Sequence, residues 1–161
     1  MTTTTDGTGA ASAEGIRRFL GDFAFLSNFA ACPVEFADPG EQSMTYRSVE
    51  PAFQAAKTLD PAARQQLSEI GSPLTAKRFG RGVLMRDGWE DMRVAVMRDL
   101  LRQKFAAEPF RSQLLATGDA EIVEGNTWHD QLWGDCECPA HEAEQGENLL
   151  GRLLMEIRAE L

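Results

Sequence analysis

The sequence predicts an α+β fold, a single mainly helical domain with a small β component. Apolar residues recur at helical spacing in several stretches, and proline and glycine mark where most of these stretches begin and end. A pair of short segments around a turn supplies the β component. The chain of 161 residues is long enough to bury one core and contains no linker that would divide it.

The β component lies mostly before the first predicted helix. Residues 19–29 mix aromatic and turn-forming residues and predict a strand end that passes into a loop. Residues 33–37 and 43–47 predict two short strands, because Asp38-Pro39-Gly40 between them is a turn signal. We therefore expect a hairpin here, and residues 121–124 predict one more strand later in the chain.

Six helices are predicted from apolar spacing and from start and stop signals. Ser48, Asp60 and Ser72 are typical of the position before a helix, and Asn148 is a candidate cap for the last one. Prolines at first helical positions and glycines after the last ones support these boundaries. The fourth helix has the clearest amphipathic pattern. The predicted helices cover residues 49–59, 61–70, 73–79, 89–105, 109–117 and 149–161.

The predicted domain covers residues 16–161, and residues 1–15 precede it as a tail rich in Thr, Gly, Ala and Ser. The tail has neither the basic start nor the apolar stretch of a secretory signal, so we expect it to be disordered. No apolar run approaches the roughly 20 residues that span a bilayer, and we expect no membrane contact. The sequence carries no signal for an oligomeric state.

Charge and cysteine content limit the function further. The net charge of -9 and the pI of about 4.7 argue against general attraction to phosphate backbones or anionic membranes. A local basic pocket for a small anion is still compatible with them. The three cysteines are an odd number, and Cys136 and Cys138 are too close in sequence for an easy mutual disulfide. We therefore expect a reduced, cytoplasmic protein.

Two segments far apart in the sequence combine a carboxylate with aromatic and small residues. They are residues 48–57, which contain Glu50, and residues 127–135, which contain Asp130. Such a mixture can hold a flat polar ligand and act on it, because aromatic faces stack on planar rings and carboxylates activate water. Gln54 would share one helix face with Glu50.

Each candidate also has an ordinary structural explanation. An acid near a helix N-terminus, such as Glu50, is favoured by the helix dipole alone. Asp130 is equally well explained as a turn aspartate that binds nearby backbone, and Trp89 at the start of a long helix is more often a core residue. Trp133 is the better stacking platform, because Gly134 after it allows close approach of a ligand.

Cys136, Cys138 and His141 offer the thiolate and imidazole groups that suit zinc. Structural zinc sites usually contain Cys-x-x-Cys and a second pair of ligands, whereas these residues form Cys-x-Cys with one histidine. We therefore expect a loop with incidental thiols and no metal site.

Many short motifs occur in order along the chain, and together they are far more specific than any one of them. They are Phe25-Leu26-Ser27-Asn28-Phe29, residues 48–57, Ser72-Pro73, Ala76-Lys77, Gly80-Arg81, Trp89, Asp130, Trp133-Gly134 and Gly146-Glu147-Asn148-Leu149-Leu150. With these motifs the chain resembles the NADAR family, the YbiA-like N-glycosidases, from Phe19 to Leu161. The resemblance implies a YbiA-like fold and an N-glycosidase that uses no metal and no cofactor.

The resemblance also implies substrates and site residues. Members act on ribosyl-phosphate pyrimidine intermediates of riboflavin biosynthesis, or on ADP-ribose attached to guanine in a nucleotide or nucleic acid. The family's catalytic residues fall on Glu50, Asp130 and Trp89. Pro51 departs from the family pattern, in which a histidine often follows the helix glutamate, so a ligand contact from that histidine is absent. The candidate substrate-binding residues are Asn28, Phe29, Lys57, Lys77, Arg81, Trp133, Gly134 and Asn148.

These residues fit the expected chemistry. Cleavage of a ribosyl C–N bond builds positive charge on the sugar, so one carboxylate should face the anomeric carbon and position or deprotonate water. Glu50 is the better candidate because a helix places it rigidly, and Asp130 would bind ribose hydroxyls or assist the leaving group. A tryptophan, Trp89 or Trp133, would stack on the base, and basic residues would neutralise phosphate.

Two other functions stay open at this point. One is a non-catalytic module that binds ADP-ribose or nucleotides, and the other is a helical interaction protein. The presence of both Glu50 and Asp130 favours an enzyme, because a pure binder of an anionic ligand gains little from two acids in its pocket. The interaction protein leaves the polar and aromatic cluster in residues 130–135 unexplained.

Overall fold

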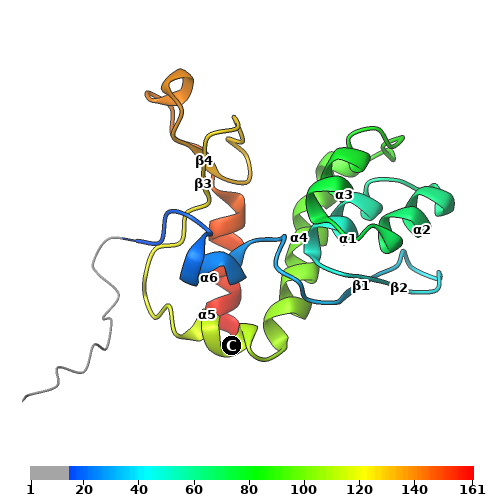
Figure 1. Cartoon of the computed structure of the whole chain (residues 1–161), viewed down its shortest axis with the longest axis horizontal. Coiled ribbons are helices and arrows are strands. Elements are labelled where there is room, and N and C mark those ends of the chain that lie inside the picture. The colour runs from blue at the N-terminus through cyan, green and yellow to red at the C-terminus, as the bar shows by residue number, and fades with distance from the viewer. Residues whose placement is uncertain (1–14) are drawn as a thin grey trace, which may run out of the picture.

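The computed structural model describes residues 15–161, and the tail predicted before them lies outside the described residues apart from Gly15. Figure 1 shows a mainly helical molecule with two separate pairs of short strands, so the predicted α+β class is confirmed. No helix in the described part is both long enough and apolar enough to cross a membrane.

In chain order, with η for a 3-10 helix, the elements are η1 (Gly21–Leu26), β1 (Val34–Phe36), β2 (Met44–Tyr46), α1 (Val49–Ala56), α2 (Pro61–Glu69), α3 (Pro73–Gly80), α4 (Trp89–Ala106), α5 (Phe110–Leu115), β3 (Gly125–Asn126), β4 (Asp135–Cys136), η2 (Pro139–His141) and α6 (Leu149–Glu160).

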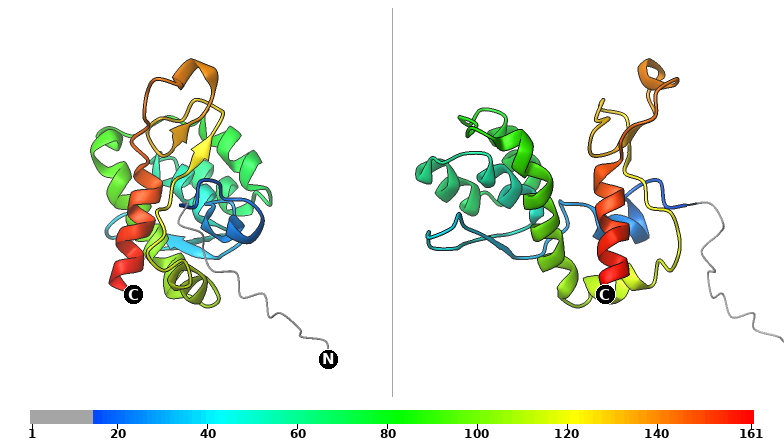
Figure 2. Two further views of the ribbon diagram at one scale, coloured as in Figure 1. Left: turned by 90° about the vertical axis from the view of Figure 1, so that its left-hand side faces the viewer. Right: turned by 180° about the vertical axis from the view of Figure 1, so that it is seen from behind.

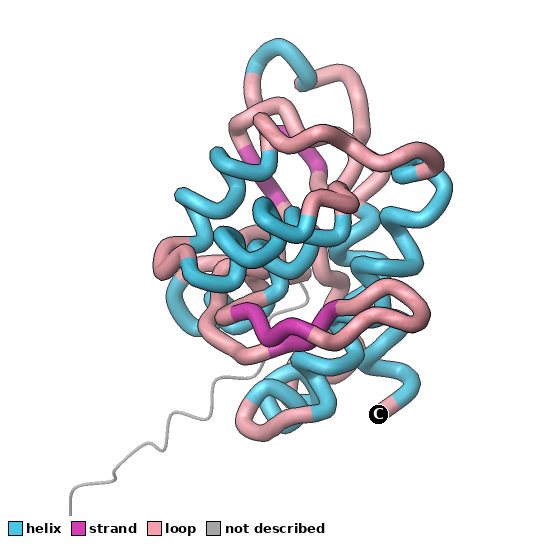
Figure 3. The backbone as a smooth tube through the Cα atoms, turned by 90° about the vertical axis from the view of Figure 1, so that its right-hand side faces the viewer, coloured by secondary structure: helices cyan, strands magenta, loops and turns pink. Residues whose placement is uncertain are grey.

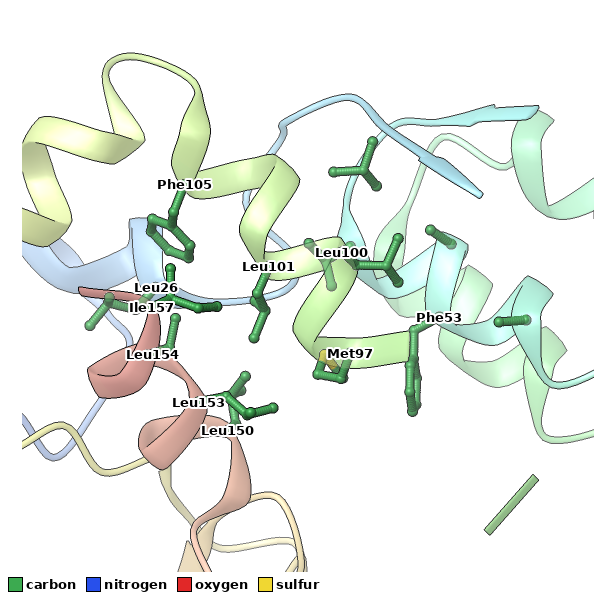
Figure 4. Packing of buried hydrophobic residues seen from close by; sticks show 14 of the residues in the cluster. Leu26, Phe53, Met97, Leu100, Leu101, Phe105, Leu150, Leu153, Leu154 and Ile157 are labelled. Atoms are coloured by element: carbon green, nitrogen blue, oxygen red, sulfur yellow. The ribbon is translucent and has the colours of Figure 1, made fainter. Parts of the chain in front are cut away.

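Helix α4 runs through the middle of the molecule (Figure 1). The β1–β2 hairpin and helices α1, α2 and α3 lie on one side of it, and α5, α6 and η1 lie on the other. Near the C-terminal end of α4, Leu101 and Phe105 approach Leu154 of α6, while Met97 lies toward Phe53 of α1 (Figure 4). One continuous core therefore joins the two sides.

Strands β1 and β2 form the predicted antiparallel hairpin. Val34 lies opposite Tyr46, and Phe36 lies opposite Met44. Val34 and Tyr46 are buried because one face of the hairpin packs against α1 and α4. Figure 3 shows the hairpin beneath the helices on this side of the molecule.

Two predicted helix caps are confirmed. The Asp60 carboxylate accepts a hydrogen bond from the Ala62 N–H at 2.9 Å, and the Ser72 hydroxyl accepts one from the Thr75 N–H at 3.3 Å. A proline follows each cap at the first helical position, where no N–H is required. Helices α2 and α3 therefore begin at the residues where a capping side chain and a proline stand next to each other in the sequence.

Ser48 and Asn148 occupy the predicted N-cap positions, but neither side chain makes a cap hydrogen bond. The Ser48 side chain makes no cap hydrogen bond, and the Glu50 N–H instead donates to the Asn28 carbonyl oxygen at 3.1 Å. This bond satisfies one N–H group at the start of α1 and ties the loop after η1 to that helix. Asn148 has a left-handed backbone (φ 49°), and its side chain binds the backbone of residues 122–124 instead of the helix.

Two elements near the N-terminal half of the chain, η1 and α1, also differ from the prediction. The strand end predicted in residues 19–29 is the 3-10 helix η1, because Gly21 takes a left-handed φ of 56° that interrupts an extended backbone. Helix α1 ends earlier than predicted. Arg64 Nε donates to the Ala55 and Thr58 carbonyl oxygens, at 3.3 and 2.9 Å, which a longer helix would bond to backbone N–H groups four residues later.

The strand predicted over residues 121–124 is reduced to a single bridge between Ile122 and Ile16. Asn148 explains the difference. Its side chain accepts a hydrogen bond from the Glu124 N–H at 3.0 Å and donates one to the Ile122 carbonyl oxygen at 2.9 Å. These are backbone groups that a longer strand would offer to a neighbouring strand.

Much of the segment formed by residues 127–147, here named the projecting segment, extends away from the helical body (Figure 2). Strand β4, which belongs to it, pairs in parallel with β3, so that Gly125 lies opposite Asp135. No residue of the projecting segment belongs to the main hydrophobic cluster, only Trp133 packs against that cluster, and Cys136 is the segment's one buried apolar side chain. The segment is therefore held by polar contacts rather than by a core of its own.

Candidate active site

A cavity of about 400 Å³ lies where the two sides of the molecule meet. This volume suits a small organic ligand. Helices α1 and α3 form one wall, and the loops beside η1 and β3 form the opposite one. The lining residues used below are Asn28, Phe29, Glu50, Phe53, Gln54, Lys57, Lys77, Glu124, Asn126, Trp128, Asp130 and Trp133.

The cavity brings together most of the residues expected from the family resemblance. Four of the expected residues do not line it: Arg81, Trp89, Gly134 and Asn148. Arg81 follows the C-terminal end of α3. Trp89 is only 4% exposed, and it packs against Phe53, a cavity-lining residue, with the two ring centres 5.1 Å apart. The expected residues that do line it are Asn28, Phe29, Glu50, Lys57, Lys77, Asp130 and Trp133.

Glu50 is a buried carboxylate held by its own helix. Gln54 lies one turn later, and its Nε2 donates a hydrogen bond to Glu50 Oε1 at 2.7 Å. Burial raises the pKa of Glu50 above its ordinary value, although the Gln54 hydrogen bond and the charge of Lys77 oppose this change. A buried carboxylate that a hydrogen bond holds at a cavity wall is suited to proton transfer.

Glu124 is a second acid in the wall, half-buried, and it was not among the residues expected from the sequence. Burial and the charge of Asp130 raise the pKa of Glu124 to about 7, against the opposing charge of Lys77. Its Oε2 is buried without a hydrogen-bond partner among the described residues. A buried oxygen without a partner is costly unless a ligand or water supplies one.

Gly134 and Asn148, two expected residues that do not line the cavity, contact Glu124 on its other side. A side chain at Gly134 would collide with the Glu124 carbonyl oxygen and carboxylate, so only glycine permits this approach. Asn148 Oδ1 accepts the Glu124 backbone N–H at 3.0 Å. Both residues contact Glu124 but do not line the cavity.

Asp130 fits both of its sequence interpretations. Its Oδ1 accepts the backbone N–H groups of Leu132 at 3.1 Å and Trp133 at 2.9 Å, as a turn aspartate does. Asn126 reinforces the turn, because its Nδ2 donates to the Asp130 carbonyl oxygen at 2.7 Å. Asp130 also lines the cavity, and its Oδ2 is the carboxylate oxygen left for a ligand.

Aromatic rings surround these acids. Phe53 contacts Trp133 edge-on, with ring centres 5.4 Å apart, so Trp133 packs against α1. Trp128 lines the cavity and is 57% exposed, which leaves a ring face available for stacking. The Lys77 ammonium lies 5.9 Å from the ring centres of both Trp128 and Phe29, within cation–π range.

Lys57 and Lys77 bring positive charge to the same cavity. Burial lowers the pKa of Lys57, and the charge of Glu50 opposes this change. The two lysines can balance the wall's acids or bind an anionic ligand group.

Gln54, Glu124, Asn126 and Trp128 are lining residues that the predicted site set does not contain. For Gln54 the signal was present, because it follows Glu50 by one helical turn. Trp128 lies within residues 127–135, the second of the two segments that combine a carboxylate with aromatic residues. Glu124 carried no local signal, because it reaches the cavity only through packing against the chain around Gly134.

Comparison with known proteins identifies the family. A model of the NADAR domain matches residues 18–161. The chain belongs to the NADAR family. The N-glycosidase YbiA of Escherichia coli (strain K12) is 39% identical to it over 143 residues, which cover 87% of this chain and 82% of that protein.

Other relatives support this assignment. The NMR structure of the E. coli protein YbiA matches with a TM-score of 0.73 and 36% identity, and the match covers 91% of this chain and 84% of that one. The riboflavin biosynthesis protein PYRR, chloroplastic, of Zea mays is 34% identical over 152 residues, which cover 86% of this chain but 23% of that protein. The predicted fold and family resemblance are therefore confirmed.

Proposed function

We propose that this protein is an N-glycosidase, a hydrolase that cleaves a ribosyl C–N bond. The observation that carries this proposal is the gathering of Glu50, Glu124 and Asp130 in one cavity beside aromatic and basic side chains. The name N-glycosidase of the E. coli relative supports the same reaction. A module that only binds nucleotides would have little use for three acids around an anionic ligand.

Glu50 activates water in this proposal. The water attacks the anomeric carbon and passes a proton to the Glu50 carboxylate, while the C–N bond breaks and its electron pair moves to the base nitrogen. Glu124, which is partly protonated near neutral pH, donates a proton to that nitrogen. Asp130 Oδ2 binds the ribose hydroxyls and stabilises the positive charge on the sugar.

Other lining residues hold the substrate. Trp128 stacks on the base, and Lys77 beside it binds a phosphate. Lys57 and Trp133 complete the binding surface. Trp89 acts as a positioning residue, because it packs behind Phe53 rather than facing the cavity.

Two substrate classes fit this arrangement: ribosyl-phosphate pyrimidine intermediates of riboflavin biosynthesis, and ADP-ribose linked to guanine. Both contain a ribosyl C–N bond, a planar base and phosphate. The name of the maize relative favours the first class. Incubation of the protein with each class separately, with chromatography of the released base, distinguishes them.

The role of Glu50 is tested by Glu50→Gln, which removes the charge with little change in volume. We expect turnover to fall by at least about a hundred-fold, while ligand binding and the circular dichroism spectrum are kept. Glu69→Gln, at an exposed position of α2, is the matched control and should keep full turnover. Near-normal hydrolysis by Glu50→Gln would show that another group activates the water.

We also propose that the enzyme works in the cytoplasm. In the described part of the chain all three cysteines, Cys32, Cys136 and Cys138, are free thiols, which supports a reducing location.

A further inference from the structure

Four metal-binding side chains meet in the projecting segment. The Nδ1 atoms of His129 and His141 are 3.4 Å apart, and Cys138 Sγ lies 3.3 Å from the first and 3.2 Å from the second. Cys136 joins them, and one ligand atom from each of the four residues lies within 4.8 Å of all the others. No other group of this kind occurs in residues 15–161.

The spacing of these atoms matches a tetrahedral zinc site. Zinc lies about 2.3 Å from thiolate sulfur and 2.0–2.1 Å from imidazole nitrogen, so tetrahedral angles place two nitrogens about 3.4 Å apart and nitrogen and sulfur about 3.6 Å apart. The observed nitrogen–nitrogen distance of 3.4 Å agrees with the first value. The sulfur–nitrogen distances of 3.2 and 3.3 Å are a few tenths of an ångström below the second.

The fold supplies the ligand that the sequence pattern lacks. Along the sequence, Cys136, Cys138 and His141 form an incomplete pattern in which the histidine has no partner. His129 is that partner, and its backbone is left-handed, with a φ of 68°. Such a φ is uncommon outside glycine, so a bonded side chain is one reason for the chain to keep it.

The surroundings indicate a structural role for a metal. No residue of the projecting segment belongs to the main hydrophobic cluster, so the segment has little apolar burial of its own. Cys136 is nevertheless buried, and Cys138 is half-buried. Small units without a core are commonly held together by a metal or a disulfide.

We propose that His129, Cys136, Cys138 and His141 bind one structural zinc ion. Two thiolates balance the charge of Zn²⁺, and four protein ligands leave no open position for catalysis. His129 stands between Trp128 and Asp130, so the metal would hold both lining residues in place. The site is separate from the proposed hydrolysis, in which water is activated by Glu50.

The test uses the full chain without an affinity tag, because a histidine tag would itself bind metal. We expect elemental analysis to find about one zinc per chain, and competition with a chromophoric chelator to give a Kd in about the nanomolar range or tighter. Cobalt in place of zinc should give the visible spectrum of a tetrahedral site and a thiolate charge-transfer band.

Substitutions separate this cluster from adventitious binding. Cys138→Ser and His141→Ala should each weaken zinc binding by at least about a hundred-fold. Cys32→Ser removes a buried thiol outside the cluster and should keep full zinc content. The chelator competition needs no variant, so it gives a result even if a substitution prevents folding.

Three results would overturn the proposal. The first is a zinc-supplied, reduced wild-type protein that holds less than about a tenth of an equivalent. The second is an unchanged zinc content in Cys138→Ser. The third is a Cys136–Cys138 disulfide whose reduction does not restore zinc binding. None of these measurements depends on the substrate, so they leave the proposed N-glycosidase function to its own test.

Discussion

Glu124 is a carboxyl group whose protonation is set by its tertiary surroundings. Burial and the charge of Asp130 raise the pKa of Glu124 to about 7, whereas an unperturbed glutamate titrates at about 4.3. Between these two pH values the folded protein binds a proton that the unfolded chain has already released. The free energy of unfolding should therefore fall as pH rises through this window and level off above it.

Glu124→Gln tests this linkage directly. The wild type should lose about 3 kcal/mol of unfolding free energy between pH 4 and pH 8 relative to the variant, because the amide does not titrate. Urea unfolding at several pH values measures the difference. Glu121→Gln, an exposed acid in the same loop, should follow the wild type. Parallel pH curves for wild type and Glu124→Gln would contradict the raised pKa.

Trp128 exposes more than half of its surface, unlike the other aromatic residues of the cavity named above. Trp128→Ala should therefore cost little stability but weaken nucleotide binding about five- to a hundred-fold, the equivalent of about 1 to 3 kcal/mol of stacking. Titration calorimetry with ADP-ribose measures the loss. Leu84→Ala, at an exposed apolar position outside the cavity, is the control. An unchanged affinity would place the base elsewhere.

At the scale of elements, the contact between α1 and α3 decides how Glu50 is held. Gly80 of α3 packs directly on the Gln54 side chain, and Gln54 donates the hydrogen bond to Glu50. A Cβ at Gly80 would collide with that side chain. The last turn of α3 thus controls the position of the carboxylate in α1.

Gly80→Ala should reduce both stability and turnover. Overpacking at this contact costs about 1 to 3 kcal/mol of unfolding free energy, and the shift of Gln54 removes a partner of Glu50. Gly82→Ala is the matched control, because the nearest atom to its added Cβ would be Phe79 O at 3.6 Å, an ordinary contact. Urea unfolding and steady-state kinetics compare the two. Equal unfolding free energy and equal turnover in the two variants would mean that α3 shifts to accept the added Cβ and leaves Gln54 in place.

At the scale of the whole molecule, the cavity is built from both sides of α4. Lys57 and Lys77 come from one side, and Glu124 and Trp128 come from the other. A ligand that touches both walls adds contacts across the molecule that the free protein lacks. Binding should therefore stabilise the entire fold and not only one wall.

Product binding should appear as a thermal shift. A ligand at a hundred times its Kd adds about 2.7 kcal/mol, which raises the Tm of a chain of this size by roughly 5 to 10 °C. ADP-ribose and ribose 5-phosphate are the products of the two substrate classes, so the larger shift identifies the class. Lys77→Ala should reduce the shift. If neither compound raises the Tm, the cavity does not bind these products.

The sequence alone determined the elements whose causes are local. Asp38-Pro39-Gly40 specifies the hairpin turn, and Asp60 and Ser72 start their helices by hydrogen bonds within a few residues. Ordered motifs likewise identified the family and placed Glu50 and Asp130 among the site residues. Each of these features depends on residue type and short spacing, which the sequence states directly.

Only the tertiary structure decided the features that depend on distant segments. Glu124 lines the cavity with a raised pKa because Gly134 permits close packing and the surroundings exclude water from the carboxyl group. The Asn148 side chain binds backbone near Ile122 instead of capping α6, and His129 meets Cys136, Cys138 and His141 in a cluster that no sequence spacing predicted. Desolvation and the meeting of donor atoms are set by three-dimensional proximity, which residue order does not encode locally.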